Sequence, residues 1–166
     1  MSVRDYPDIQ PQPQVIDLTK GRQAIVDDTD YYDLSKHKWY ASPSRNTYYA
    51  RRDIYRNGTK KTIYMHAAIL GAKKGCVTDH INGNGLDNRR SNLRFATNSQ
   101  SAVNQKNRSD NTSGQRGIHW HKGSGKWQAR IRVNQKYICL GSFHRLDEAT
   151  KVYEDAANLY FGEYRR

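Results

Sequence analysis

The chain has 166 residues, a length that fits one or two small domains. Lys and Arg number 28 against 16 Asp and Glu, giving a net charge of +12, and 11% of the residues are aromatic. We find no apolar run long enough to cross a bilayer, no signal-peptide pattern at the N-terminus, and two distant cysteines expected to be reduced thiols. These features argue against a membrane protein and a disulfide scaffold. They predict a folded cytoplasmic protein whose leading partner is nucleic acid.

Composition predicts four segments. Residues 1–14 contain three prolines and read as a flexible N-terminal extension. Residues 15–108, with 17 Lys or Arg against 8 Asp or Glu, are expected to form the first domain, and the small residues at 109–114 a linker. Residues 115–166, with 10 basic against 5 acidic residues, are expected to form the second domain. Both domains are basic, so we expect both to contact the same polyanion.

The first domain opens with strand-like segments at 23–26 and 38–41, separated by a polar, acidic stretch. The strongest local pattern is Asn57-Gly58 between two β-rich runs at 47–56 and 59–65, which predicts a hairpin with a type I′ turn. A short helix at 66–70 is expected to follow and to end at a glycine. The hairpin carries cations that either contact DNA phosphates or are simply solvated: Arg51, Arg52, Arg56, Lys60 and Lys61.

The second domain predicts strands at 116–121, 126–133 and 137–143. In the middle strand, apolar residues alternate with Gln128, Arg130 and Arg132, so that one face is apolar and the other cationic. Apolar residues at helical spacing from Leu146 onward predict a helix that covers the apolar face. The cationic face is then left free.

Residues 79–104 have the most unusual composition. Eight asparagines fall within the thirty residues from Asn82 to Asn111, as in a loop held by its own side chains. We expect a strand ending at Asp79 and His80, a glycine-rich loop, a return strand at 93–96, and a polar helix capped by Thr97 and running to about residue 107. A carboxylate suits Mg²⁺, and an adjacent imidazole is able to take a proton from water. An Asp-His pair alone is weak evidence for a catalytic metal site.

Residues 79–94, DHINGNGLDNRRSNLR, resemble the core of the HNH homing endonucleases common in phage genomes. The segments KWY, YYA and IYMH, upstream of this core, resemble the N-terminal half of that family. The second domain is similar to an AP2 DNA-binding domain in four segments of residues 116–143: RGI, GKW, ARIR and LGSF. The resemblance implies an α+β fold: a ββα-metal (HNH) nuclease core with an N-terminal β-hairpin region, then a small three-stranded antiparallel sheet with one helix.

The resemblance also implies roles for the motif residues. Asp79 corresponds to a metal ligand, His80 to the general base, and Asn92 to the residue whose amide fixes the loop around His80. The third motif position, a His or Asn in the family, is Ser101 here. Asn104 lies one helical turn after it and Asn98 about one turn before it, so either is an alternative ligand. One Mg²⁺ or Mn²⁺ per site is implied.

Contacts with DNA in the AP2-like sheet are implied for Arg116, His119, His121, Arg130 and Arg132. A solvated sheet face is the alternative. Zinc held by His66, Cys76 and His80 is disfavoured, because these residues lack paired ligand spacing.

The function expected is that of a phage-type, metal-dependent endonuclease that hydrolyses phosphodiester bonds in double-stranded DNA, by nicking or as a site-specific homing enzyme. A monomer is expected, with a dimer as the route to double-strand cuts, and neither a membrane nor a small-molecule cofactor is involved. The alternative is a DNA-binding protein whose nuclease site has been weakened by Ser101.

Overall fold

The computed structural model describes residues 11–105, 107 and 110–165, which form two compact units. The first unit contains the described residues up to Ala72 together with Asn84–Arg94. The second contains Lys73–Gly83 and the described residues from Phe95 onward. This division in space differs from the predicted division along the chain, because Asp79 and His80 join the C-terminal sheet in one unit. The predicted sequence domains stay a prediction. Residues 1–10, 106, 108, 109 and 166, which fall in the expected extension, first domain, linker and second domain, lie outside the described residues.

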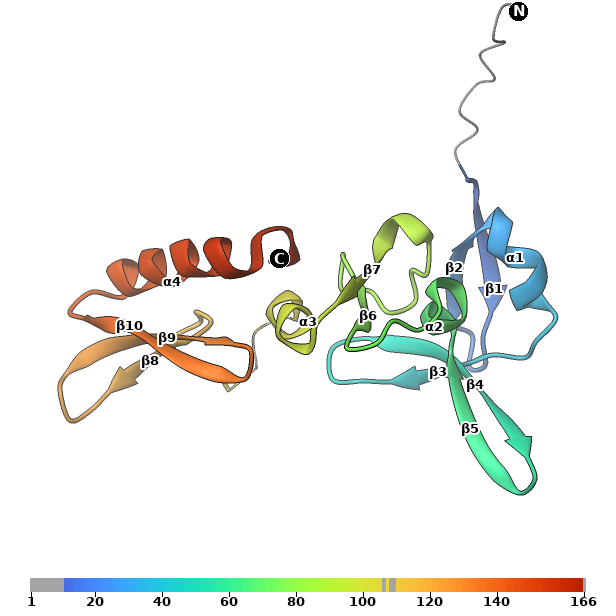
Figure 1. Ribbon diagram of the computed structural model, residues 1–166, viewed down its shortest axis with the longest axis horizontal. Coiled ribbons are helices and arrows are strands. Elements are labelled where there is room, and N and C mark those ends of the chain that lie inside the picture. The colour runs from blue at the N-terminus through green and yellow to red at the C-terminus, as the bar shows by residue number, and fades with distance from the viewer. Residues whose placement is uncertain (1–10, 106, 108–109, 166) are drawn as a thin grey trace, which may run out of the picture. The chain divides into compact units, whose positions relative to one another are not determined.

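The first unit is built from two small antiparallel sheets and two helices (Figure 1). Its elements in chain order are β1 (Pro13–Asp17), β2 (Gln23–Asp27), α1 (Asp28–Ser35), β3 (Tyr40–Pro43), β4 (Tyr48–Arg56), β5 (Thr59–Tyr64) and α2 (Met65–Leu70). β1 pairs with β2, and the second sheet has the order β3-β4-β5. The core of this unit surrounds Trp39, which is 2% exposed and donates from Nε1 to the Leu34 carbonyl at 2.8 Å.

Two elements of this unit differ from the sequence predictions. The expected flexible extension was wrong at its end, because Pro13 and Gln14 belong to β1. Pro13 is the first residue of this strand, a position at which a strand tolerates proline. The acidic stretch after β2 is the helix α1, whose first turn carries Asp28 and Asp30. Carboxylates are stabilised there by the positive end of the helix dipole.

The predicted hairpin and the short helix after it are confirmed. Arg56 pairs with Thr59 across a turn in which Asn57 and Gly58 have φ of 49° and 72°, the two positive values that a type I′ turn requires. The helix α2 ends at Gly71, whose φ is 77°.

The second unit combines a three-stranded antiparallel sheet with helices. Its elements are β6 (Val77–His80), α3 (Asn98–Asn104), β8 (Ile118–His121), β9 (Lys126–Val133), β10 (Lys136–Phe143), α4 (Leu146–Phe161) and the 3₁₀ turn η2 (Gly162–Tyr164). The sheet has the order β10-β9-β8. Strand β7 (Leu93–Ala96) follows the 3₁₀ turn η1 (Arg90–Asn92) and forms a two-stranded sheet with β6.

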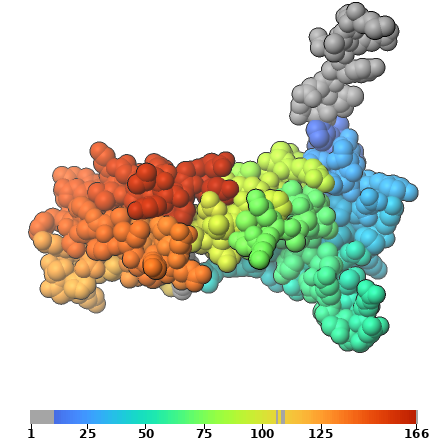
Figure 2. Space-filling view, in the orientation of Figure 1, coloured from blue at the N-terminus to red at the C-terminus, as the bar shows by residue number. Residues whose placement is uncertain are grey.

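The predicted alternation in β9 is confirmed. Ala129 and Ile131 are buried, whereas Arg130 and Arg132 are exposed. The helix α4, red in Figures 1 and 2, lies along one side of the sheet and shares a core with the buried residues of β9. The fold is therefore α+β with small antiparallel sheets, as expected at that level. No helix among the described residues is long and apolar enough to span a membrane.

Candidate active site and nucleic-acid surface

The end of β6 and one face of α3 bring together the side chains singled out around Asp79. Ser101 donates its hydroxyl to Asp79 Oδ1 at 3.1 Å, and Asn104 Nδ2 donates to Asp79 Oδ2 at 3.0 Å. The same Asn104 nitrogen donates to the His80 carbonyl at 2.7 Å. Asp79, His80 and Asn104 are 7%, 5% and 4% exposed. Asp79 thus binds the side chains of both Ser101 and Asn104, and Asn104 also binds the backbone of His80.

Local sequence fixes where α3 begins, and therefore which face meets Asp79. Thr97 accepts from the Gln100 amide at 3.3 Å, and Gln100 Oε1 accepts from the Thr97 amide at 2.8 Å, forming the capping box. From this start, Ser101 and Asn104 lie one turn apart on the same face. Asn98, the other alternative ligand, lines a cavity together with Ser99, Ala102 and Val103.

The donor set around Asp79 fits a hard divalent cation. Asn104 Oδ1 is buried and has no hydrogen-bond partner among the described residues. A buried amide oxygen without a partner is costly, and a cation would satisfy it. A carboxylate, an amide oxygen and a hydroxyl are the oxygen donors that Mg²⁺ accepts. Among the residues that the structure describes, no group of three or more His, Cys, Asp or Glu side chains is placed to hold a metal ion.

The loop between β6 and β7 is held by its own polar groups and by Asp27 of β2. Asn92 is 7% exposed and donates from Nδ2 to the Asp87 carbonyl at 2.7 Å. Arg89 binds the Asp87 carboxylate through two nitrogens, at 2.8 and 2.7 Å. The Arg90 amide donates to Asp27 Oδ2 at 2.8 Å. Asn92 therefore closes this loop.

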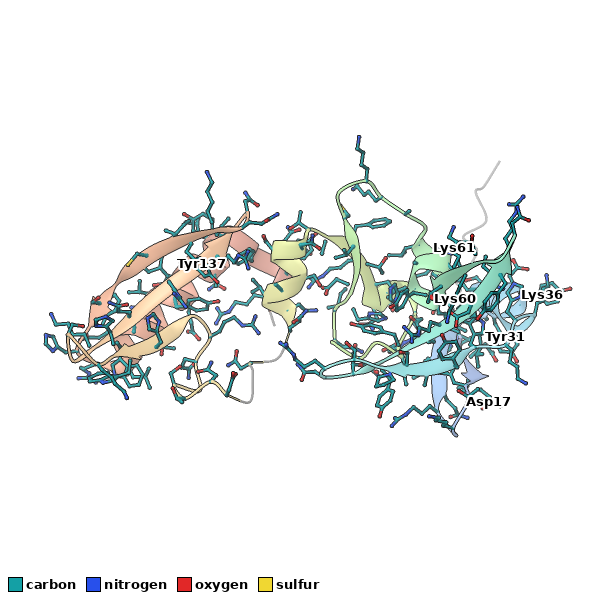
Figure 3. All side chains as sticks on the ribbon, turned by 90° about the horizontal axis from the view of Figure 1, so that it is seen from below. Asp17, Tyr31, Lys36, Lys60, Lys61 and Tyr137 are labelled. Atoms are coloured by element: carbon teal, nitrogen blue, oxygen red, sulfur yellow. The ribbon has the colours of Figure 1, made fainter. Side chains whose placement is uncertain are left out.

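The cations of the β4–β5 hairpin occupy different environments. Arg51 and Arg52 are half-buried, and their guanidinium groups lie over the rings of Tyr40 and Trp39 at 5.3 and 5.4 Å. Arg56, Lys60 and Lys61 are exposed near the tip of the hairpin, where Figure 3 labels the two lysines.

Asp53 ties this hairpin together. It accepts hydrogen bonds from the hydroxyls of Tyr40 and Thr62, both at 2.7 Å, and forms an ion pair with Lys60 at 2.8 Å. The Lys60 ammonium, with the hydroxyls of Thr62 and Tyr40, lowers the pKa of Asp53 from 3.8 to about 2. Lys60 thus has a carboxylate partner within the protein.

We predict that Asp53→Asn removes a stabilisation that depends on pH. A carboxyl whose pKa is depressed by folding contributes its full stabilisation above the unfolded pKa, about 4, and loses it as the pH falls toward 2. Circular dichroism melting should therefore show a larger Tm difference between wild type and Asp53→Asn at pH 6 than at pH 2.5. An equal difference at both pH values would contradict this assignment.

The face of the C-terminal sheet opposite α4 is cationic and aromatic. Arg130 and Arg132 lie on both sides of Tyr137, with guanidinium-to-ring distances of 4.9 and 5.5 Å. Tyr137 pairs with Arg132 across β9 and β10 and is 62% exposed (Figure 3). His119 opposes Gln128 on the same face. The three strands, all described, contain no Asp or Glu.

Sequence reasoning did not single out Tyr137 as a surface residue. The available signal was strand pairing: the tight turn at Asn134 and Gln135, with φ of 47° and 67°, places Tyr137 opposite Arg132. Two other predicted DNA contacts have partners within the protein. His121 Nδ1 accepts from the Ser124 amide at 3.1 Å, and Arg116 donates to the backbone of α3.

Part of the chain matches a known protein family, and two viral proteins resemble much of its length. The sequence model of the HNH endonuclease family matches residues 70–103, a range that contains Asp79, His80, Asn92 and Ser101. The chain is 31% identical over 115 residues to Protein 3.8 of Escherichia phage T7, covering 69% of this chain and 94% of that protein. It is 29% identical over 145 residues to the Uncharacterized HNH endonuclease L560 of Acanthamoeba polyphaga mimivirus, covering 87% and 74%. No solved structure matches significantly. The chain therefore belongs to the family of phage T7 Protein 3.8, and it contains an HNH endonuclease domain.

Proposed function

We propose that this protein is a metal-dependent HNH endonuclease that nicks one strand of double-stranded DNA. The observation that carries the proposal is the contact of Asp79 with Ser101 and Asn104 beside His80. Asp79, His80 and Ser101 lie within residues 70–103, which match the HNH family, and Asn104 follows directly after them. One such site per chain acts on one phosphodiester. A double-strand cut or a homing activity then requires a second chain or a second encounter. The host-cell cytoplasm is the expected place of action.

Asp79 and Asn104 would hold a Mg²⁺ or Mn²⁺ ion through the carboxylate and the amide oxygen. Bound there, the cation would stabilise the negative charge of the phosphate and the leaving oxygen. The Ser101 hydroxyl orients the Asp79 carboxylate by its hydrogen bond. Ser101 would itself be a metal ligand only if Asn104 is not. Because Asn104 Oδ1 is buried, the Asn104 amide is favoured over Ser101 as the ligand expected from the third motif position.

His80 acts as the general base. Its imidazole takes a proton from the attacking water, the water oxygen bonds to phosphorus, and the bond from phosphorus to the leaving sugar oxygen breaks. The bond from Asn104 to the His80 carbonyl fixes the backbone that carries this side chain. Asn92 closes the loop that follows through its bond to the Asp87 carbonyl.

Target binding is assigned to the AP2-like sheet, with Arg130, Arg132 and His119 on its free face. A major groove accepts a face of this kind, and base edges there carry sequence information. Arginines also neutralise phosphates, so binding is expected to weaken with salt. In the hairpin, Arg56 and Lys61 supply further phosphate contacts.

We predict that Arg132→Met weakens DNA binding in EDTA and lowers the slope of log K against log salt by about 0.9, the value for one lost phosphate contact. Fluorescence anisotropy across salt concentrations measures both. Lys151→Met is the matched control, because it removes one exposed cation from α4, which covers the other face of the sheet. Equal slopes for the wild type and Arg132→Met would contradict the assigned face.

A supercoiled-plasmid assay tests the proposed function. Open-circular product should form with Mg²⁺ or Mn²⁺ and should be absent with EDTA. DNA binding without nicking in either metal would instead support the alternative of a DNA-binding protein with a weakened site, for which Ser101 at the third motif position is the specific reason.

A further inference from the structure

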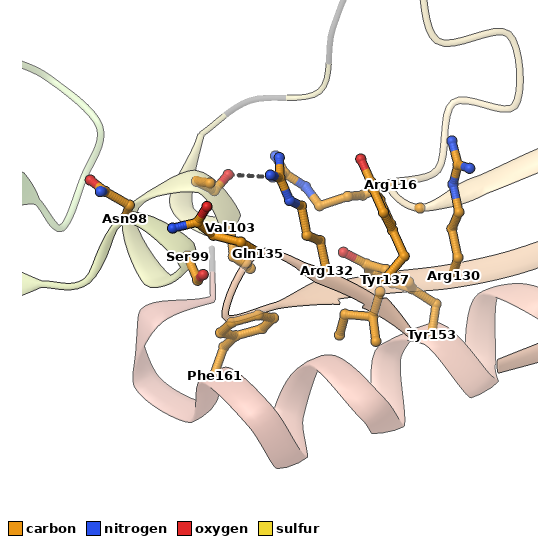
Figure 4. A pocket seen from close by; sticks show the side chains of 13 residues that line it. Asn98, Ser99, Val103, Arg116, Arg130, Arg132, Gln135, Tyr137, Tyr153 and Phe161 are labelled. Carbon is orange, nitrogen blue, oxygen red and sulfur yellow. Dashed lines mark hydrogen bonds between the residues drawn. The ribbon is translucent and has the colours of Figure 1, made fainter. Parts of the chain in front are cut away.

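Arg116 forms a cap at the C-terminal end of α3. Its Nη1 donates to the Ala102 carbonyl at 2.6 Å, and its Nη2 donates to the Gln105 carbonyl. Figure 4 shows the first of these bonds as a dashed line. The last carbonyls of a helix lack partners within the helix, and a cation there also meets the negative end of the helix dipole. The last turn of α3 has no basic residue of its own, so the guanidinium comes from the start of the C-terminal sheet.

The position of Arg116 is fixed by the residue after it. Gly117 has a φ of 69°, and its carbonyl accepts from the Arg130 amide at 2.8 Å. A Cβ at residue 117 would lie 2.5 Å from the Arg130 carbonyl oxygen and would overlap the Tyr153 ring. Only glycine fits, and this close approach holds Arg116 beside β9.

Apolar packing holds the same side of α3. Val103 belongs to the core formed by Ile118, Ile131, Tyr153 and Phe161 of the sheet and α4. Burial lowers the pKa of Arg116, although arginine keeps its charge near neutral pH. A partly buried guanidinium whose donors reach two carbonyls is a directional link.

The two faces of α3 therefore have different neighbours. Ala102 and Val103 face the C-terminal sheet, with a cavity of about 510 Å³ beside them that is also lined by Arg116, Arg130 and Arg132. Ser101 and Asn104 face Asp79. A shift of α3 along its axis would move Ser101 and Asn104 relative to Asp79.

We propose that Arg116 is a positioning residue of the nuclease site: it holds α3 so that Asn104 and Ser101 stay in register with Asp79. This inference rests on the proposed function. It makes the C-terminal sheet a structural part of the nuclease site as well as a DNA-binding surface, and it replaces a direct DNA contact as the main role of Arg116.

The test compares Arg116→Met, Arg116→Lys and Arg132→Met in the full chain. Hydrogen exchange of the α3 amides reports the helix without metal or DNA, and electron paramagnetic resonance reports Mn²⁺ affinity. Arg116→Met should speed exchange at the C-terminal turn of α3 and weaken Mn²⁺ binding about tenfold, the range seen when groups supporting a metal ligand are removed. Arg116→Lys, which keeps one cationic donor, should recover part of both. Arg132→Met removes a cation from the same cavity and should change neither, while lowering DNA affinity.

Wild-type exchange and Mn²⁺ affinity in Arg116→Met, with DNA affinity alone reduced, would overturn the inference and make Arg116 a DNA contact. Global loss of structure in Arg116→Met, seen as exchange throughout both units, leaves Arg116→Lys to decide: unchanged α3 exchange and Mn²⁺ affinity in that variant would overturn the inference. A wild type that neither binds Mn²⁺ nor nicks DNA would contradict the proposed function, and α3 exchange would still decide whether Arg116 holds the helix.

Discussion

His80→Ala should abolish nicking while leaving DNA affinity nearly unchanged. Removal of a general base costs about 100- to 10,000-fold in rate, because the water then loses its proton without a positioned acceptor. His80 is 5% exposed and lies at the end of β6, which is not a strand of the C-terminal sheet assigned to binding. Rates are measured from supercoiled plasmid at saturating metal, and affinities from anisotropy in EDTA.

His144→Ala is the matched control for this variant. His144 is exposed in the short connection between β10 and α4, and its removal should leave the nicking rate unaltered. Loss of binding and nicking in equal proportion, in a folded His80→Ala protein, would show that His80 supports DNA binding instead of proton transfer.

Asn104→Ala should reduce nicking by about 10- to 100-fold and raise the metal concentration needed for half-maximal rate. The variant removes the buried amide oxygen and both hydrogen bonds that Asn104 makes, to Asp79 and to the His80 carbonyl. Mn²⁺ titrations of nicking, with DNA binding in EDTA as a control, measure the effect.

Ser101→Asn separates the two candidates for the third ligand. If Asn104 is the ligand, an added amide at residue 101 should not speed nicking or tighten Mn²⁺ binding. A faster and tighter-binding Ser101→Asn protein, together with a harmless Asn104→Ala, would assign the ligand to residue 101 instead.

Local patterns predicted the elements whose signals lie within a few residues. The Asn57-Gly58 pair defined the hairpin, and the alternation around Arg130 defined β9. β1 was missed because prolines before it resemble a flexible segment, although a strand tolerates proline at its first position. α1 was missed because Leu34 is its only buried residue, so it has almost no apolar stripe.

The candidate site was predictable in its members but not in its geometry. The resemblance to HNH endonucleases implied roles for Asp79 and His80, and it left residues 98, 101 and 104 as alternatives for the third ligand. Which side chain of α3 contacts Asp79 depends on where the helix begins and on the contacts that its other face makes with the C-terminal sheet. The AP2 resemblance assigned Arg116 to a DNA contact. No local pattern links Arg116 to the carbonyls that it caps, because they lie 11 and 14 residues earlier in the chain.

The most direct test of this account is a metal-triggered, single-turnover experiment. The protein is bound to supercoiled plasmid in EDTA, excess Mg²⁺ or Mn²⁺ is added, and the plasmid forms are followed by electrophoresis. We predict conversion to the open circle by the wild type, with linear DNA appearing only later, and no conversion by His80→Ala. A plasmid that is bound yet stays supercoiled with both metals, or is nicked equally by His80→Ala, would contradict the assignment of residues 79–104 as a nuclease site.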